Sequence, residues 1–406
     1  MLSFKIQAKV NNGDVLGVGY WKLNKLMLKS VGLWPYQKSS TKMCIRTFIF
    51  IAIYSMMIPQ IIRTFEEWGK NSEIVIENIT GFLYFQVVIT KYVTSCIAES
   101  NLQYLYVRIT EDWNHFRDEG EQKVLSHFAS HGRFLTIGYS VYLYTAGIAF
   151  TTLPCLIPAV LDLIIPLNDS RQKVLCFYGE YFIDQRVYYY ELLLHTFVCV
   201  MCTIMLFTTI DAAYACCIEH VIGLFNIVDY RLNQAFNLVK DKYDTKSEVM
   251  RSEIHKCVLR SIEVHNHSIE IVELIQTTYT TCFFFTTGIS LICLSLGTVD
   301  MMLSVNNYIN FARVFFAWCG IVIYFFYISM PGQRIIDASS DIFNSVYFSG
   351  WYDFPLKTQR LLKFMMMRCS VPCQFTAGPL LVLNLENCGV ILKTAMSYCT
   401  FVFAIS

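Results

Sequence analysis

The C-terminal stretch holds residues whose types and spacing are suited to an ion path. From Leu385 onward the chain is apolar except for a few hydroxyl-bearing and charged side chains. Ionisable groups in a membrane helix usually face protein or water, which favours a helix that borders an aqueous pore. A packed helix whose charges reach the membrane surface explains the same residues, and composition alone leaves both interpretations open. Helical spacing places five residues near one face: Thr394, Ser397, Tyr398, Phe401 and Ile405.

The same final segment carries two ionisable residues, Glu386 and Lys393, toward its inner end. Elsewhere, clusters of the kind that catalysis or metal binding requires are not recognisable. His265-x-His267 has no third ligand nearby, and the C-x-x-C pair of Cys199 and Cys202 has no second pair to complete four ligands. The net charge of +1, with acids balancing bases, argues against a nucleic-acid partner. We therefore expect no enzymatic activity, no metal and no cofactor.

The overall composition indicates a membrane protein. Hydrophobic residues make up 55% of the chain and charged residues 16%, against about 25% charged residues in soluble proteins. A helix needs roughly 20 apolar residues to cross the hydrocarbon core, and apolar runs of about this length recur along the chain. Seven membrane spans are expected, over 47–62, 79–98, 134–161, 192–210, 274–299, 314–333 and 385–406.

The distribution of lysine and arginine predicts the orientation of these spans. With a cytosolic N-terminus, the segments on the inner side carry 23 such residues and those on the outer side carry 5. Cytosolic loops are enriched in lysine and arginine, so the N-terminus is predicted inside the cell and the C-terminus outside. This orientation is the reverse of that of a G-protein-coupled receptor. Glycosylation sequons begin at Asn168, in an outer loop, and at Asn78, at the membrane edge.

The predicted fold is all-α, a single seven-helix transmembrane domain over 1–406. The alternating charges of 211–273 predict that the fourth and fifth helices project beyond the membrane. Pro331-Gly332-Gln333 is predicted to break the chain and end the sixth span, because proline removes a helical hydrogen bond. Within the domain, 334–378 is predicted to form a cytosolic segment and 385–406 the last helix.

The cytosolic segment contains an amphipathic helix after Pro355. At helical spacing, Leu361, Leu362, Met365 and Met366 lie along one side. An apolar side outside the membrane needs a covering. The lipid surface and a neighbouring protein both provide one, and the residues alone do not choose between them.

Several short motifs, in their order and spacing, resemble those of the insect odorant receptor family, which keeps most of its shared residues near the C-terminus. They are Gly32-Leu33-Trp34-Pro35, Trp351-Tyr352-Asp353-Phe354-Pro355, Arg360-Leu361-Leu362, Met365-Met366-Met367-Arg368 and Ser397-Tyr398. The family's shared coreceptor has a long insertion between the fourth and fifth helices, which 211–273 is too short to contain. The chain therefore resembles a ligand-tuned subunit.

This resemblance implies an odorant receptor subunit that binds small volatile apolar organic ligands in smell perception. Such subunits form a heterotetramer with coreceptor subunits and open a non-selective cation pore. They lie in the plasma membrane of olfactory sensory neuron dendrites, in contact with membrane lipid. In the family, the cytosolic segment joins neighbouring subunits in an anchor, and here the resemblance gives that role to Trp351, Tyr352, Leu361, Leu362, Met365 and Met366.

The family also lines its ion path with the last helix and closes it with apolar rings near the outer end. Matching Ser397-Tyr398 to the family pattern places those rings at Phe401 and Ile405. An apolar constriction blocks ions because it is too dry to hydrate them.

The family's odorant pocket lies among the outer halves of the second, third, fourth and sixth helices, where aromatic and aliphatic side chains suit an apolar ligand. For any single residue there, helix packing or lipid contact is an equally good account. The candidates are Phe82, Phe85, Tyr142, Ala146, Phe150, Phe197, Met201, Tyr308, Phe311 and Phe315.

Two other kinds of chemoreceptor are alternatives. A G-protein-coupled receptor also has seven spans, but the Asp-Arg-Tyr and Asn-Pro-x-x-Tyr motifs are missing and the charge bias is inverted. A gustatory receptor typically ends with Thr-Tyr, five apolar residues and Gln-Phe. Here Ser397-Tyr398 is followed by no glutamine.

Overall fold

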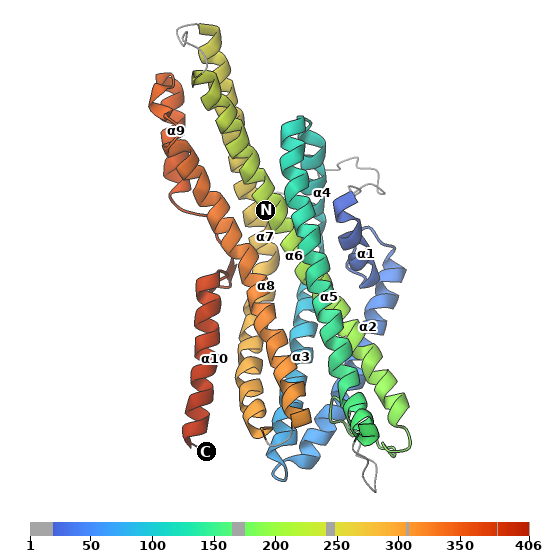
Figure 1. Ribbon diagram of the computed structural model, residues 1–406. Coiled ribbons are helices and arrows are strands. Elements are labelled where there is room, and N and C mark those ends of the chain that lie inside the picture. The colour runs from blue at the N-terminus through green and yellow to red at the C-terminus, as the bar shows by residue number, and fades with distance from the viewer. Residues whose placement is uncertain (1–18, 165–174, 241–247, 306–307, 380, 406) are drawn as a thin grey trace.

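The computed structural model describes residues 19–164, 175–240, 248–305, 308–379 and 381–405 (Figure 1). Side chains at 159, 161, 240, 308, 309 and 398–405 lie outside the described part as well. The elements, in chain order, are η1 Gly19–Trp21, α1 Lys22–Ser30, α2 Ser39–Glu67, α3 Ser72–Ile97, α4 Glu99–His115, α5 Glu119–Ile164, α6 Tyr189–Lys240, α7 Glu248–Leu303, α8 Tyr308–Tyr347, η2 Trp351–Asp353, α9 Leu356–Cys369, β1 Thr376–Ala377, β2 Leu381–Val382 and α10 Leu385–Ile405.

The fold is helical, as predicted. Within the described ranges, six helices are long and apolar enough to cross a membrane: α2, α3, α5, α6, α7 and α8. The last helix, α10, adds 21 residues. α2, α5 and α7 end, and α3, α6 and α8 begin, at the end of the bundle where α10 finishes (Figure 1). We call this the C-terminal end. α4, α6 and α8 end, and α5, α7 and α9 begin, at the opposite end, the α9 end.

Three helices are much longer than a membrane is thick. α5, α6 and α7 contain 46, 52 and 56 residues. At about 1.5 Å per residue, each is more than twice as long as a hydrocarbon core of about 30 Å. The predicted extension of the fourth and fifth helices is therefore confirmed in length. The third predicted helix, which corresponds to α5, is extended too. The charged residues before 134 lie in its extension, so hydropathy did not predict it.

The centre of the bundle is α6, which packs against α5, α7 and α8. Every residue from 206 to 225 is buried. A helix that is apolar on all sides is stable only when neighbours surround it, and the other long helices supply that enclosure. α10 instead lies at the edge of the bundle, against α7 and α8 (Figure 1).

The predicted break at Pro331-Gly332-Gln333 is wrong, because α8 continues through Pro331 to Tyr347. One missing hydrogen bond does not end a helix whose flanking turns are well buried, and both Ile328 and Ile335 are buried in the core. Gly332 has a different task. A Cβ at this position would lie 1.9 Å from the carbonyl oxygen of Leu383, so only glycine admits the chain that leads into α10.

A short antiparallel hairpin positions the start of α10. β1 and β2 pair Thr376 with Val382 and Ala377 with Leu381. Gln276 of α7 binds both backbone groups of Thr376: its Nε2 donates to the carbonyl oxygen at 3.0 Å, and its Oε1 accepts from the amide at 2.9 Å. The hairpin is thereby fastened to α7, and α10 begins directly after it.

Candidate ligand pocket and ion path

An aromatic group lies toward the C-terminal end of the bundle. Phe85 of α3 is buried, and its ring centroid lies 5.6 Å from that of Phe177, in the segment between α5 and α6. The Phe177 ring also lies 5.4 Å from that of Phe150 on α5, edge to face. Two of the predicted pocket residues, Phe85 and Phe150, therefore meet through a third ring that sequence reasoning missed. These three residues are called the aromatic group below.

The other predicted pocket residues are spread over the same helices. Phe82, Tyr142, Ala146, Phe197 and Met201 are half-buried. Met201 lies near α5, because its Cε would be 3.2 Å from a Cβ on Gly147.

On α8, Phe311 and Phe315 stack on each other with centroids 6.2 Å apart. Phe315 is 41% exposed, so this stack borders the surface of the single chain. The side chain of Tyr308 lies outside the described ones.

The segment that carries Phe177 is held to α8 and α2, and through α8 to α3. Arg313 of α8 donates through Nη1 to the carbonyl oxygen of Cys176 at 2.8 Å and through Nη2 to Glu77 of α3 at 2.6 Å. On the other side, the Glu180 amide donates to the carbonyl oxygen of Pro59 in α2 at 2.9 Å. Backbone hydrogen bonds at Cys176 and Glu180, before and after Phe177 in the sequence, therefore fix the position of Phe177.

A buried ion pair lies at the centre of the bundle. Lys91 of α3 contacts Asp211 of α6, and the side chains are 1% and 0% exposed. Tyr139 of α5 donates to the second carboxylate oxygen of Asp211 at 3.1 Å. The Lys91 ammonium also lies 3.8 Å from the ring centroid of Phe207 and 4.3 Å from that of Tyr324 on α8. Side chains from α3, α5, α6 and α8 therefore meet at this ion pair.

The inward side of α10 is apolar, whereas its outward side carries polar side chains among the exposed Leu385, Val390 and Met396. Cys388, Ile391 and Ala395 are buried, which places this side against α7 and α8. Glu386, Lys393 and Ser397 are exposed and follow one another at intervals of seven and four residues. We call these three residues the polar stripe. Of the predicted pore residues, Thr394 is half-buried beside it, and the side chains of Tyr398, Phe401 and Ile405 lie outside the described ones.

Toward the α9 end, Asp112 of α4 accepts hydrogen bonds from two histidines. The Nε2 of His220 lies 2.8 Å from one carboxylate oxygen, and the Nε2 of His267 lies 2.7 Å from the other. Burial acts to raise the pKa of Asp112, but these hydrogen bonds outweigh it and hold the pKa below its ordinary value. His265 contacts Cys369 instead, at 3.3 Å. The His265-x-His267 pair therefore serves two separate contacts.

The predicted anchor residues fall into two groups. Leu362 and Met365 of α9 are buried in the chain's own core, and Leu361, Met366 and Trp351 are half-buried. Tyr352 is exposed. Other apolar side chains of this region face outward, and sequence reasoning missed them: Tyr347, Phe348, Leu356, Phe364, Met367 and Val371.

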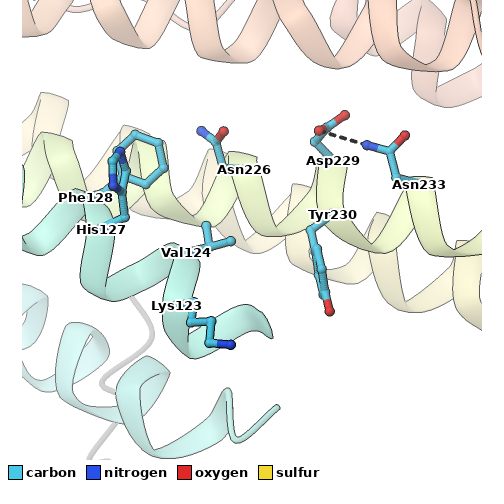
Figure 2. A pocket seen from close by; sticks show the side chains of 8 residues that line it. All are labelled: Lys123, Val124, His127, Phe128, Asn226, Asp229, Tyr230 and Asn233. Carbon is cyan, nitrogen blue, oxygen red and sulfur yellow. Dashed lines mark hydrogen bonds between the residues drawn. The ribbon is translucent and has the colours of Figure 1, made fainter. Parts of the chain in front are cut away.

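A surface cleft of about 500 Å³ lies between α5 and α6 near the α9 end (Figure 2). Asn233 donates to Asp229 across one turn of α6 at 3.0 Å, as Figure 2 shows. The lining combines polar and charged side chains with the apolar Val124 and Phe128. It consists of Lys123, Val124, His127, Phe128, Asn226, Asp229, Tyr230 and Asn233.

The long apolar helices, which enclose a buried ion pair, define a multi-pass helical membrane protein. Comparison with known families then gives a narrower assignment. The family model of the 7tm odorant receptors matches residues 64–396, and the chain belongs to this family.

Individual relatives agree with this assignment. Odorant receptor 9a of Drosophila melanogaster is 23% identical over 188 residues, 45% of this chain and 46% of that protein. The chain thus spans about half the length of this curated relative.

Two solved structures of the insect olfactory receptor OR5 from Machilis hrabei cover 97% of this chain and all of theirs. The complex with eugenol gives a TM-score of 0.76 at 12% identity, and the other structure 0.72 at 13%. At this level of identity, the likeness shows the fold.

Proposed function

We propose that this chain is the odorant-binding subunit of a ligand-gated, non-selective cation channel for smell perception. The observation that carries the proposal is the orientation of α10. Its polar stripe faces away from the chain's own bundle, while Cys388, Ile391 and Ala395 pack inward. Charged groups that face lipid are costly, so a water-filled path completed by other subunits accounts for the stripe best.

In this proposal, the last helix forms one wall of the pore. Thr394, Ser397 and Tyr398 line the path, and Phe401 and Ile405 provide the apolar constriction toward the outer end. α10 borders α7 and α8 at one edge of the chain, so a closed path needs neighbouring chains. We propose coreceptor subunits as those neighbours, in a heterotetramer.

The outward apolar side chains near α9 support the assembly. Phe364 is 66% exposed, and Tyr352, Leu356 and Met367 are exposed nearby. Large apolar side chains exposed close together in sequence mark a surface that another protein or a membrane covers. We propose that it packs against the matching region of adjacent subunits, while Leu362 and Met365 stabilise the anchor from within the chain.

The ligand-binding site in this proposal lies around the aromatic group. The buried ring of Phe85 on α3 and the half-buried rings of Phe150 and Phe177 offer the apolar surroundings that small volatile molecules require. The solved Machilis receptor, whose fold this chain shares, was obtained in complex with eugenol. With the N-terminus cytosolic, as the lysine and arginine bias indicates, this site lies toward the outer side of the plasma membrane.

A recording from excised membrane patches tests this function. Cells would express the chain together with its coreceptor, and an odorant panel would be applied to inside-out patches in the absence of GTP. We expect evoked cation current, because ligand binding and pore opening occur in one assembly. Coreceptor alone is the control. Current that disappears on excision and returns with GTP would support the G-protein alternative instead.

A further inference from the structure

Two buried amide side chains toward the C-terminal end of the bundle have polar atoms without a hydrogen-bond partner in the described part of the chain. Gln60 of α2 is 1% exposed, and neither its Oε1 nor its Nε2 is paired. Asn78 of α3 is 2% exposed, and its Nδ2 is unpaired. Buried polar groups in native proteins are nearly always hydrogen-bonded, so these two require an explanation.

Gln60 lies beside the aromatic group. Its Oε1 and the nearest ring atoms of Phe177 each lie 3.4 Å from the position that a Cβ on Gly81 would occupy. Gly81 therefore brings the amide and the ring together by having no side chain. Asn78, Gly81 and Phe85 follow at intervals of three and four residues on one buried face of α3. The two amides and the three rings thus border the same part of the bundle.

Phe177 differs from the other two rings because it comes from a connecting segment. The segment is held by Arg313 at Cys176 and by Pro59 at Glu180, so the Phe177 ring is inserted between Phe85 and Phe150 from outside. An aromatic ring already lies between aromatic walls and beside an unpaired amide. That is the environment an aromatic ligand with one polar atom would have.

We propose that Gln60 and Asn78 form a polar subsite for the oxygen of an aromatic alcohol, phenol or ketone, and that the Phe177 ring holds the place of the ligand's ring. The inference rests on the proposed function and deepens it by naming the ligand class. The Nε2 of Gln60 and the Nδ2 of Asn78 are donors and the Oε1 of Gln60 is an acceptor, which together match a hydroxyl or a carbonyl. A hydrocarbon of the same shape leaves the amides unpaired and is rejected for that reason.

The test uses pairs of odorants matched in shape but differing in the oxygen: phenethyl alcohol with propylbenzene, acetophenone with cumene, and hexanol with heptane. Currents would be recorded from cells that express the coreceptor with wild-type chain, Gln60→Met or Ile61→Met. Methionine resembles glutamine in shape, and Ile61 is an exposed neighbour on α2, which makes Ile61→Met the matched control. Asn78→Leu repeats the test if Gln60→Met does not reach the surface.

We expect wild-type chain to respond to the oxygenated aromatic members. Gln60→Met should lower sensitivity to these by about tenfold, the change that the loss of one hydrogen bond produces. It should raise sensitivity to the hydrocarbons, because one amide that they would leave unpaired is gone. Phe177→Ala should raise sensitivity to phenethyl alcohol, because a competing ring is gone. If Gln60→Met changes the sensitivity to both odorants of each pair equally, or changes neither, the amides hold a structural water instead of a ligand. Preference for hexanol would overturn the aromatic part.

Thermal unfolding of the purified chain, with phenethyl alcohol or propylbenzene added, separates this inference from the channel function. Stabilisation of wild-type chain by the alcohol, lost in Gln60→Met, supports the subsite even where no current is evoked, and the channel proposal alone then fails. A second outcome is that odorants evoke current, but the alcohol does not selectively stabilise the wild-type chain and Gln60→Met does not selectively lose sensitivity to it. That outcome would contradict the subsite and support the channel. If no probe evokes current and no probe stabilises the chain, both proposals are wrong.

Discussion

Lys91 and Asp211 form an ion pair between α3 and α6 in a part of the bundle that solvent does not reach. Charges taken out of water are tolerated only when each is paired and hydrogen-bonded. Here Tyr139 completes the carboxylate, and two rings face the ammonium. The pair therefore fixes how α3, α5, α6 and α8 lie relative to one another, between the aromatic group and the α9 end.

Removing one member of this pair should be strongly destabilising. We expect Lys91→Met to reduce the free energy of unfolding by about 3–5 kcal/mol, because it leaves a buried carboxylate uncompensated. Thermal unfolding of purified chain and surface labelling of cells measure the effect. Lys22→Met, on an exposed position of α1, is the control. The double variant Lys91→Met with Asp211→Leu should recover much of the loss. A double variant as unstable as the single one would contradict this account.

The orientation of the chain can be tested with epitope tags. We expect a C-terminal tag to be labelled on intact cells and an N-terminal tag only after permeabilisation, because lysine and arginine concentrate in the segments assigned to the cytosol. A tag on an intracellular protein controls for membrane integrity. The opposite labelling pattern would remove the channel proposal.

Cysteine accessibility tests whether the polar stripe faces the ion path. Ser397→Cys should be modified by a charged thiol reagent and lose odorant-evoked current. Ala395→Cys, two residues earlier and buried against the chain's own helices, should be spared. Wild-type chain measures the background from native cysteines such as the exposed Cys44. Equal insensitivity of both variants, with labelling of Ser397→Cys verified on protein gels, would place the ion path elsewhere.

The outward side of α9 should govern assembly. Phe364→Asp puts a charge into the proposed subunit contact, so less coreceptor should be recovered with the chain by co-immunoprecipitation. Lys357→Asp, also exposed on α9, changes charge without removing an apolar group and should leave recovery unchanged. Undiminished recovery with Phe364→Asp would assign this surface to something other than the coreceptor.

Acid should weaken the junction of α4, α6 and α7 through Asp112. The pKa of Asp112 lies below its ordinary value of 3.8 because two histidines donate to the carboxylate. Its contribution to stability is therefore present above pH 3.8 and is lost as pH falls through the lower native pKa. The unfolding temperature of Asp112→Asn should be well below that of the wild-type chain at neutral pH, and the two temperatures should converge in strong acid. A gap that stays constant with pH would rule out the ionised carboxylate as its cause.

Six of the seven spans that hydropathy predicted fall on helices long and apolar enough to cross a membrane, since the cost of polar groups in lipid constrains every residue of such a helix. The course of α8 through Pro331 could not be predicted, because burial of Ile328 and Ile335 on neighbouring turns decides it. Similarly, the amphipathic pattern of α9 marked Leu362 and Met365 as apolar. It did not say that they pack within the chain rather than against another subunit.

The Lys91–Asp211 pair and the position of Phe177 were not predicted, although the sequence carries weak signals of both. Lys91 is an isolated charge in an apolar span, and Asp211 directly follows another, so a pairing was available to pattern reasoning. Phe177 lies among apolar residues in a connection expected to be polar. Its insertion between Phe85 and Phe150 depends on how helices far apart in sequence are arranged, which no local pattern encodes.

The contact between Gly332 and the Leu383 carbonyl has a consequence for inheritance. A methyl group at position 332 would overlap that oxygen, so even the smallest coding change, glycine to alanine, would force apart α8 and the chain entering α10. Among natural alleles of this gene, those that encode any other residue at 332 should behave as null alleles, and under the proposed function animals with two such alleles should lose the response to the odour that the chain binds.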